Sequence, residues 1–272
     1  MIEVSKEELT INDEFAKERN VFPLIDAMLK LDDIYCAVNS TNTIMAVQGN
    51  KFFPMWIWNS NKLNDIESKE LMEYIKDRVI NHNLKMVIVK NNVYENLREL
   101  YPYIINNTVI MNAYINKKPK LNVEISGTID YAKKDENKII ADFLIGYDEE
   151  IDHTGLSRED ALEDASGLIS NPTFYVWRNE QQEIVTIGKL NYDSDTVIRI
   201  NCVFTKPEER RKGYSAMLMY ALCNKILEME KIPMLYADKA YLPANKSYQN
   251  VGFQKIGEIV EIELSENKQT KT

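Results

Sequence analysis

The sequence has few of the residues that build metal sites, disulfide frameworks and histidine-dependent active sites. Its 272 residues include three cysteines and two histidines. Cys36, Cys202 and Cys223 are odd in number, far apart and form no Cys-x-x-Cys pair, while His82 and His153 have no neighbours at metal-ligand spacing. We therefore expect neither disulfides nor a metal site. Nothing in the sequence arranges a Ser-His-Asp or Cys-His mechanism.

Long apolar runs are also missing. No segment approaches the roughly 18 consecutive apolar residues of a membrane span. The first residues, Met1–Glu8, are acidic and lack the apolar core of a signal peptide. The hydrophobic fraction of 44% is that of a globular protein. These features predict a cytoplasmic protein with no membrane partner.

Positive charge is in the minority. The chain has 33 Lys and Arg against 42 Asp and Glu, a formal net charge of −9. This balance opposes non-specific nucleic-acid binding, which depends on a cationic surface. We therefore expect no nucleic-acid partner, and the acidic balance would suit a cationic small molecule.

The order of predicted elements is similar in the two halves of the chain. Aromatic and β-branched runs predict first-half strands at 34–38, 43–48, 53–58, 84–89 and 108–115, with helices at 67–82 and 94–100. The second half has predicted strands at 173–178, 183–190, 196–204, 234–238 and 253–264, with helices at 137–146, 157–169, 213–230 and 244–251. A polar stretch with a proline, 116–120, separates the halves. We expect two mixed α/β domains, 1–118 and 119–264, followed by a polar tail, 265–272.

The turn after the predicted strand 196–204 carries the clearest chemical signal. Residues Arg210–Ser215 read Arg-Arg-Lys-Gly-Tyr-Ser and lead into a predicted helix. A tight turn of this kind points successive backbone N–H groups into one space beside the positive end of the helix dipole, and Gly213 lets the backbone approach a ligand closely. Its three basic residues add charge suited to a pyrophosphate or a 3′-phosphate. The alternative interpretation is an exposed basic turn with a glycine for conformation.

Two motifs of the second half resemble those of the GNAT N-acetyltransferase superfamily. Residues 203–215, Val-Phe-Thr-Lys-Pro-Glu-Glu-Arg-Arg-Lys-Gly-Tyr-Ser, resemble a strand ending Val-x-x-x-Pro-Glu and then Arg/Gln-x-x-Gly-x-Gly/Ala opening a helix. Residues 245–253, Asn-Lys-Ser-Tyr-Gln-Asn-Val-Gly-Phe, match the signature Asn-x-x-Tyr-x-x-x-Gly-Phe. Ser215 stands where Gly or Ala is usual. The resemblance covers about residues 119–264.

The resemblance implies an α/β (α+β) fold of tandem mixed sheets flanked by helices, with acetyl-CoA as the acyl donor. The first half resembles a degenerate GNAT-like domain, because residues 58–63 lack the glycine and the arginines of the CoA loop. The implied cofactor-binding residues are Val203, Phe204, Arg210, Arg211, Lys212, Gly213, Tyr214, Ser215 and Asn245. Tyr248 is implied as the proton donor to the leaving thiolate. The general base is not identified, since Asn201 on the central strand is an amide.

An acidic run lies where the family has the border of its acceptor pocket: Asp148, Glu149, Glu150, Asp152, Glu159, Asp160, Glu163 and Asp164. This run would attract a cationic amine, although a solvated helix face with Ser157 as N-cap is the more ordinary interpretation.

The sequence thus predicts an enzyme that transfers an acyl group to the primary amine of a small molecule. We expect this enzyme to be a monomer or a homodimer. One alternative is a non-catalytic acyl-CoA-binding or regulatory module. Another is acylation of a protein or peptide, including transfer from an aminoacyl-tRNA, against which the acidic charge balance argues.

Overall fold

The computed structural model describes residues 1–124 and 126–265, which form two compact units. Both units consist of separate segments of the chain. Unit 1 combines Met1–Ala113 with Tyr236–Tyr241 and the segment that begins at Lys255, and unit 2 combines Tyr114–Leu235 with Leu242–Gln254.

The units differ from the contiguous domains, 1–118 and 119–264, that the sequence suggests. The first crossing from one unit to the other, after Ala113, lies close to the expected boundary. The last strand, however, is counted with the first unit and not with the second. Of the expected polar tail, 265–272, all but Ser265 lies outside the described residues.

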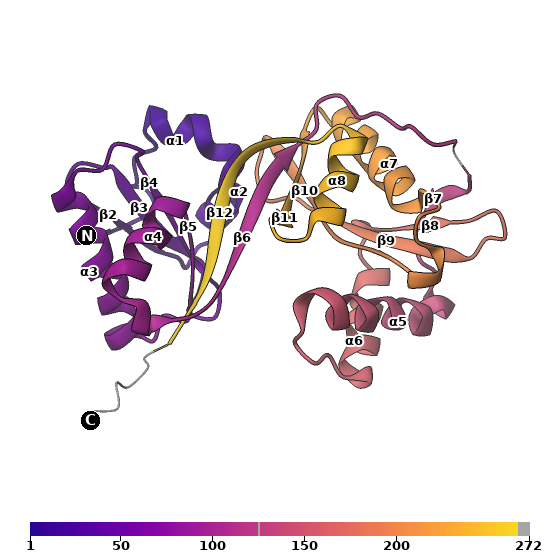
Figure 1. Ribbon diagram of the computed structural model, residues 1–272, viewed down its shortest axis with the longest axis horizontal. Helices are drawn as coiled ribbons and strands as arrows, with labels where there is room; N and C mark the ends of the chain where they lie inside the picture. Colours follow the sequence, from indigo (N-terminus) through magenta and orange to yellow (C-terminus); the bar gives the residue numbers. More distant parts are fainter. Residues whose placement is uncertain (125, 266–272) are drawn as a thin grey trace. The chain divides into compact units, whose positions relative to one another are not determined.

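Unit 1 is a mixed sheet with helices (Figure 1). In chain order its elements are β1 (Ile2–Val4), α1 (Asp13–Glu18), η1 (Arg19–Val21), α2 (Pro23–Leu29), β2 (Tyr35–Val38), β3 (Ile44–Gln48), β4 (Met55–Asn59), α3 (Asp65–His82), β5 (Met86–Val89), α4 (Asn91–Leu100), η2 (Pro102–Ile104), β6 (Ile105–Ile115) and β12 (Gln254–Leu264). The strand order is β1-β2-β3-β4-β5-β12-β6. Strands β4 and β5 run parallel, with Trp56 opposite Ile88, and β12 pairs antiparallel with β5.

Helix α3 shows how the sequence specifies an element of unit 1. Asn64 accepts from the backbone N–H groups of Ile66 and Glu67, and the Glu67 side chain accepts from the Asn64 N–H, which forms a capping box. Helically spaced apolar side chains, Leu71 and Ile75 among them, are fully buried against the sheet. The helix ends at Asn83, which adopts a left-handed conformation.

Unit 2 holds the turn singled out by the sequence. Its elements are β7 (Thr128–Asp130), η3 (Lys134–Glu136), α5 (Asn137–Tyr147), η4 (Asp148–Asp152), α6 (Arg158–Ile169), β8 (Phe174–Arg178), β9 (Ile184–Asn191), β10 (Val197–Thr205), η5 (Pro207–Glu209), α7 (Tyr214–Glu228), β11 (Ile232–Asp238) and α8 (Leu242–Val251). Its strand order is β11-β10-β9-β8-β7. Helices α5 and α6 lie on one side of these strands, and α7 and α8 lie on the other (Figure 1).

The alternation of side chains along β9 assigns its two faces. Ile187 belongs to the core beneath α5 and α6. A Cβ on Gly188 would meet Leu218 and Leu222 of α7, so this position faces the opposite side. Because side chains of a strand alternate, Lys189 lies on the same face as Ile187. That face carries the cavity described below.

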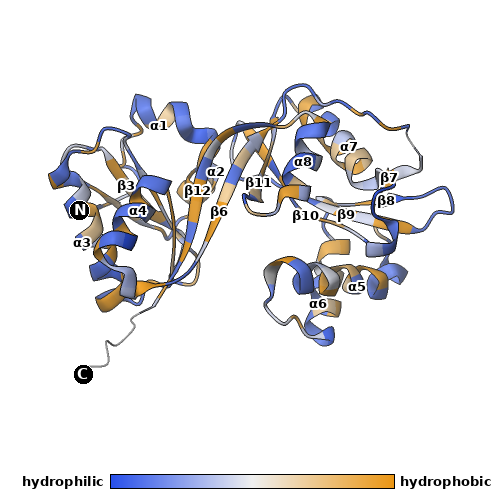
Figure 2. Cartoon of the chain, in the orientation of Figure 1, coloured by the Kyte–Doolittle hydropathy of each residue, from blue (hydrophilic) through white to orange (hydrophobic). Residues whose placement is uncertain are grey.

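The mixed α/β architecture agrees with the prediction from sequence. Helices α1 and α4 are composed largely of hydrophilic residues (Figure 2). The α-helices and β-strands that the sequence did not predict are β1, α1, α2 and β7. None of the helices formed by residues 1–124 and 126–265 combines the length and apolar character needed to cross a bilayer.

Candidate functional site

Strand β10 changes its pairing partway along its length. Its parallel pairing with β11 joins Val197–Arg199 to Ile232–Met234, and its antiparallel pairing with β9 begins at Arg199, opposite Asn191, and continues to Thr205. The register with β9 shifts between Asn201 and Phe204, which marks an irregularity of the bulge type. At this bulge Cys202 has a φ of 52°, in the left-handed region that non-glycine residues rarely adopt. Such bulges and backbone outliers re-aim side chains and are common next to active sites.

Gly213 opens helix α7 at the far end of the turn. It has a φ of 86° and is the N-cap residue, yet no side chain caps this helix end. A Cβ at this position would lie 3.2 Å from Cγ2 of Val123. The first N–H groups of an α-helix have no partner within the helix, and here they coincide with the positive end of its dipole. Backbone N–H groups at a helix start of this kind can bind an anion.

Two of the three basic side chains of the turn are engaged with carboxylates. The Nη2 atom of Arg210 donates to both carboxylate oxygens of Glu150, at 2.7 and 2.9 Å, and Nε donates to the Thr205 carbonyl at 3.0 Å. The Nζ of Lys212 lies 2.9 Å from Oε2 of Glu209, and this hydrogen bond raises the pKa of Lys212. The side chain of Arg211 is exposed. An incoming anion would compete with Glu150 for Arg210.

The other residues expected to bind the cofactor lie on both sides of this turn. The ring of Phe204 is buried edge-on against Phe143 and Tyr147, with 6.3 Å between ring centroids in each pair, so only its backbone can serve a ligand. Val203 is half-buried at the bulge, and Tyr214 and Ser215 are half-buried in the first turn of α7.

Helix α8 carries the second motif and packs against α7. Asn245 is buried, and its Oδ1 accepts a hydrogen bond of 2.9 Å from the Tyr114 hydroxyl. Tyr248 is half-buried, with its ring edge-on to Phe253 at a centroid distance of 6.0 Å. The structure thus places the strand–turn–helix residues together, and it places Asn245 and Tyr248 on the helix beside them.

A cavity of about 300 Å³ lies on the α5–α6 side of the sheet, at the bulge of β10. Its lining comprises Leu144, Tyr147, Asp148, Thr154, Leu156, Asp164, Leu168, Lys189, Asn201 and Cys202. Oδ1 of Asn201 is buried and has no hydrogen-bond partner within the described residues. Lys189 is the cross-strand partner of Asn201.

Sequence reasoning did not single out this cavity. It gave Cys202 no role in a site and did not consider Lys189. The available signal was that Lys189 is the single charged residue in the strand Ile184–Asn191. Its meaning depends on the register with β10, which no local pattern specifies.

Asp148 holds the connection between α5 and α6. Its carboxylate accepts from the backbone N–H groups of Thr154, Gly155 and Leu156, each at 2.9 Å, and from the Thr154 hydroxyl. These hydrogen bonds, with that of the Thr154 side chain the largest, lower the pKa of Asp148 to about 2. A carboxylate so fully engaged is an anchor for the turn and a poor proton acceptor.

The rest of the acidic run is exposed, as a solvated helix face would be: Glu149, Glu150, Glu159, Asp160, Glu163 and Asp164. The side chain of Asp152 lies outside the described part of the chain. Ser157 caps α6 and accepts from the Asp160 N–H at 3.1 Å, which confirms the predicted N-cap.

All three cysteines are free thiols. Among residues 1–124 and 126–265, no group of three or more His, Cys, Asp or Glu side chains is placed to hold a metal ion.

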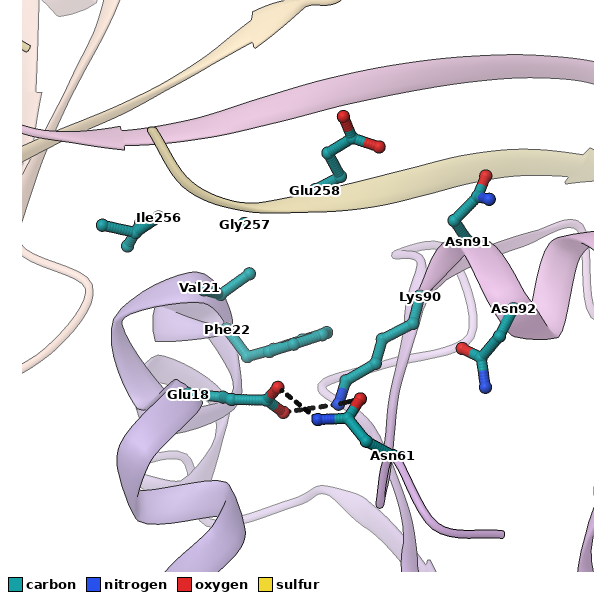
Figure 3. A pocket seen from close by; sticks show the side chains of 10 residues that line it. All are labelled: Glu18, Val21, Phe22, Asn61, Lys90, Asn91, Asn92, Ile256, Gly257 and Glu258. Carbon is teal, nitrogen blue, oxygen red and sulfur yellow. Dashed lines mark hydrogen bonds and ion pairs between the residues drawn. The ribbon is translucent and has the colours of Figure 1, made fainter. Parts of the chain in front are cut away.

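In unit 1, donor groups of the segment after β4 form hydrogen bonds with carboxylates of helix α1. The Asn61 N–H donates to Oε1 of Glu14 at 2.8 Å, and the Ser60 hydroxyl donates to Oε2 of the same side chain at 2.6 Å. Glu18 accepts from Asn61 Nδ2 and forms an ion pair with Lys90, as the dashed lines of Figure 3 show. Glu18, Asn61 and Lys90 border a cavity of about 310 Å³. The Ser60 hydroxyl and the backbone and side-chain donors of Asn61 are therefore already satisfied by Glu14 and Glu18 of α1.

Comparison with known proteins supports both the motifs and the fold. The family model described as "FR47-like protein" matches residues 189–262. No curated protein sequence matches the chain significantly.

Several solved structures resemble the chain over nearly its whole length. A Drosophila protein solved by a structural genomics consortium is 11% identical over 97% of each chain, with a TM-score of 0.66. A GCN5-related N-acetyltransferase from Kribbella flavida is 13% identical, with 93% of this chain and 96% of that chain covered and a TM-score of 0.60. A GNAT-family acetyltransferase from Colwellia psychrerythraea is 11% identical, with 94% and 99% covered and a TM-score of 0.58. At such identities the likeness shows a shared fold.

Proposed function

We propose, from its GNAT fold, its two GNAT-like motifs and the match of residues 189–262 to the FR47-like family model, that the chain is an acetyl-CoA-dependent N-acetyltransferase of the GNAT superfamily. The acceptor in this proposal is the primary amine of a small molecule. The observation that carries the proposal is the bulged end of β10 followed by the uncapped, glycine-led start of α7. In the proposal, the backbone N–H groups of this arrangement bind the pyrophosphate of CoA.

In the proposed reaction the amine nitrogen attacks the thioester carbonyl. A carbon–nitrogen bond forms and the carbon–sulfur bond breaks, while one proton leaves the nitrogen and one reaches the sulfur. Tyr248 is the proposed donor to the sulfur. An unperturbed phenol has a pKa near 10, so Tyr248 would assist a thiolate of slightly lower basicity through its position.

The cavity at the bulge is the proposed acceptor site. It opens beside Asn201 and Cys202, on the strand whose end leads into the proposed CoA turn. A volume of about 300 Å³ matches the lower end of small-molecule sites. Since Asp148 is held by its four hydrogen bonds, the amine proton would pass to water.

The test is thiol release from acetyl-CoA when the purified chain is offered a panel of amines. Tyr248→Phe should lower kcat by about tenfold or more while leaving the Kd for CoA nearly unchanged, because only proton transfer is affected. Tyr192→Phe, an exposed tyrosine on unit 2, is the matched control and should keep full activity. Equal turnover in Tyr248→Phe would remove this residue from the mechanism.

A second candidate is an acyl-CoA-binding module without turnover. Two observations favour it: Asn201 is an amide on the central strand, and Asp148 is a poor base. This candidate predicts CoA binding by calorimetry with no thiol release across the whole panel. Detectable turnover with any amine would reject it.

A further inference from the structure

Two polar side chains on neighbouring strands line the cavity without a partner for their polar ends. Asn201 Oδ1 is buried and accepts no hydrogen bond from the described residues. Lys189 is a half-buried residue, and its ammonium makes no hydrogen bond or ion pair within residues 1–124 and 126–265. A buried acceptor without a donor and a half-buried cation without an anion both carry a desolvation cost. A ligand with a donor and an anionic group would relieve both.

The spacing of these two groups limits the ligand. Asn201 and Lys189 face each other in the antiparallel pairing of β10 and β9. Cross-strand partners have Cβ atoms about 5 Å apart. A ligand whose donor and anionic group are close neighbours, as the amine and carboxylate on one carbon are, can therefore meet both side chains.

The rest of the lining indicates what the ligand carries beyond these groups. Four apolar or aromatic side chains complete much of the wall: Leu144, Tyr147, Leu156 and Leu168. The cavity volume of about 300 Å³ suits one small molecule and not an extended polyamine. The cation of Lys189 would also oppose a polycationic acceptor.

Building on the proposed acetyltransferase function, we propose that the acceptor is an α-amino acid with an apolar side chain. Its carboxylate pairs with Lys189, and its amine donates to Oδ1 of Asn201, which holds the nitrogen at the bulge of β10. The exposed carboxylate of Asp164, which also lines the cavity, attracts the ammonium form before it loses its proton. The bonds made and broken are those of the proposed reaction.

Matched acceptor pairs test this proposal directly. Phenylalanine and phenethylamine, and leucine and 3-methylbutylamine, differ only in the carboxylate. With the full chain and acetyl-CoA, kcat/KM from thiol release should be about tenfold or more higher for the amino acid of each pair, as expected for a charge-assisted hydrogen bond. Lys189→Met should reduce this ratio to near one, and Lys189→Arg should preserve it.

Lys138→Met, an exposed position on α5 outside the cavity lining, is the control and should keep both the ratio and the rates. Thermal melting of each variant establishes that it is folded. Acetylation of both members of a pair with equal kcat/KM would overturn the amino-acid proposal and leave the acetyltransferase proposal standing. A ratio unchanged in Lys189→Met would also overturn it.

If no thiol is released from acetyl-CoA with any acceptor, the acetyltransferase proposal fails. Calorimetry with the same pairs then tests whether the cavity binds a carboxylate. Tighter binding of the amino acid than of its amine, lost in Lys189→Met, would still support a carboxylate site at Lys189. Equal binding would reject that site.

Discussion

Gly213 is the residue on which the proposed cofactor turn depends most. Its φ of 86° is strained for any L-residue, and an added Cβ would press on Val123. Gly213→Ala should therefore lower the free energy of unfolding by about 1 kcal/mol or more. Because the strain falls on the backbone that offers the N–H groups, the Kd for CoA should rise about fivefold or more. Chemical denaturation and calorimetry measure the two effects.

Gly167→Ala provides the matched control for this substitution. Gly167 lies within α6, has no left-handed φ, and a Cβ there would meet nothing within 4 Å. Alanine should stabilise this helix by about 0.5–1 kcal/mol and leave CoA binding unchanged. If the two variants behaved alike in both measurements, the proposed role of the Gly213 conformation would be wrong.

The residues of the turn could be predicted from sequence because their chemistry is local. The basic residues, the glycine and the start of the predicted helix follow one another within a few positions of the sequence. The motif that contains Asn245 and Tyr248 is equally compact. Lys189 and Asn201 could not be paired in this way, since they lie on different strands and meet through a bulged register. The ion pair of Arg210 with Glu150, sixty positions earlier, is likewise a product of tertiary structure.

At the scale of elements, the connection between α5 and α6 depends on one ionised carboxylate. Asp148→Asn removes the charge that three backbone N–H groups and the Thr154 hydroxyl share, so this variant should unfold more readily near neutral pH. Glu149→Gln, an exposed neighbour, is the control and should melt like the unmodified chain.

The pH dependence of this difference follows from the pKa of Asp148. Folding lowers it from 3.8 to about 2, so the ionised form stabilises the native state above the unfolded pKa. The gap in unfolding free energy between the unmodified chain and Asp148→Asn should be constant from pH 7 to about 5 and shrink as pH falls through 4 toward 2. Urea denaturation at several pH values measures it, and a gap independent of pH would contradict this role.

Most long elements could be predicted from their periodicity. The expected helices at 67–82 and 157–169 correspond to Asp65–His82 and Arg158–Ile169, within two residues at each end. The first thirty residues gave no clear pattern, because α1 and α2 are short and their buried faces rest on few side chains, such as Phe15 and Ile25.

At the scale of the whole chain, the last strand belongs with the first unit. Strand β12 lies between β5 and β6, and Val260 and Ile262 are fully buried in the unit 1 core. Sequence patterns identified a strand at 253–264 but assigned it to the second domain, because hydrophobic alternation does not specify which sheet a strand joins. Its pairing partner is set by contacts between residues more than 170 positions apart, such as Val89 and Val260.

A fragment of residues 1–118 should therefore not fold cooperatively. Without β12, strands β5 and β6 lose the neighbour between them, and the core that includes Val87 and Val89 is opened to water. Circular dichroism with thermal melting should show a broad, non-cooperative transition for the fragment and a cooperative one for the full chain. Addition of a synthetic peptide, Gln254–Leu264, should restore part of the transition, because it supplies the missing strand, whereas a peptide of the same composition in scrambled order should not. A fragment that melts cooperatively by itself would show that unit 1 does not require β12.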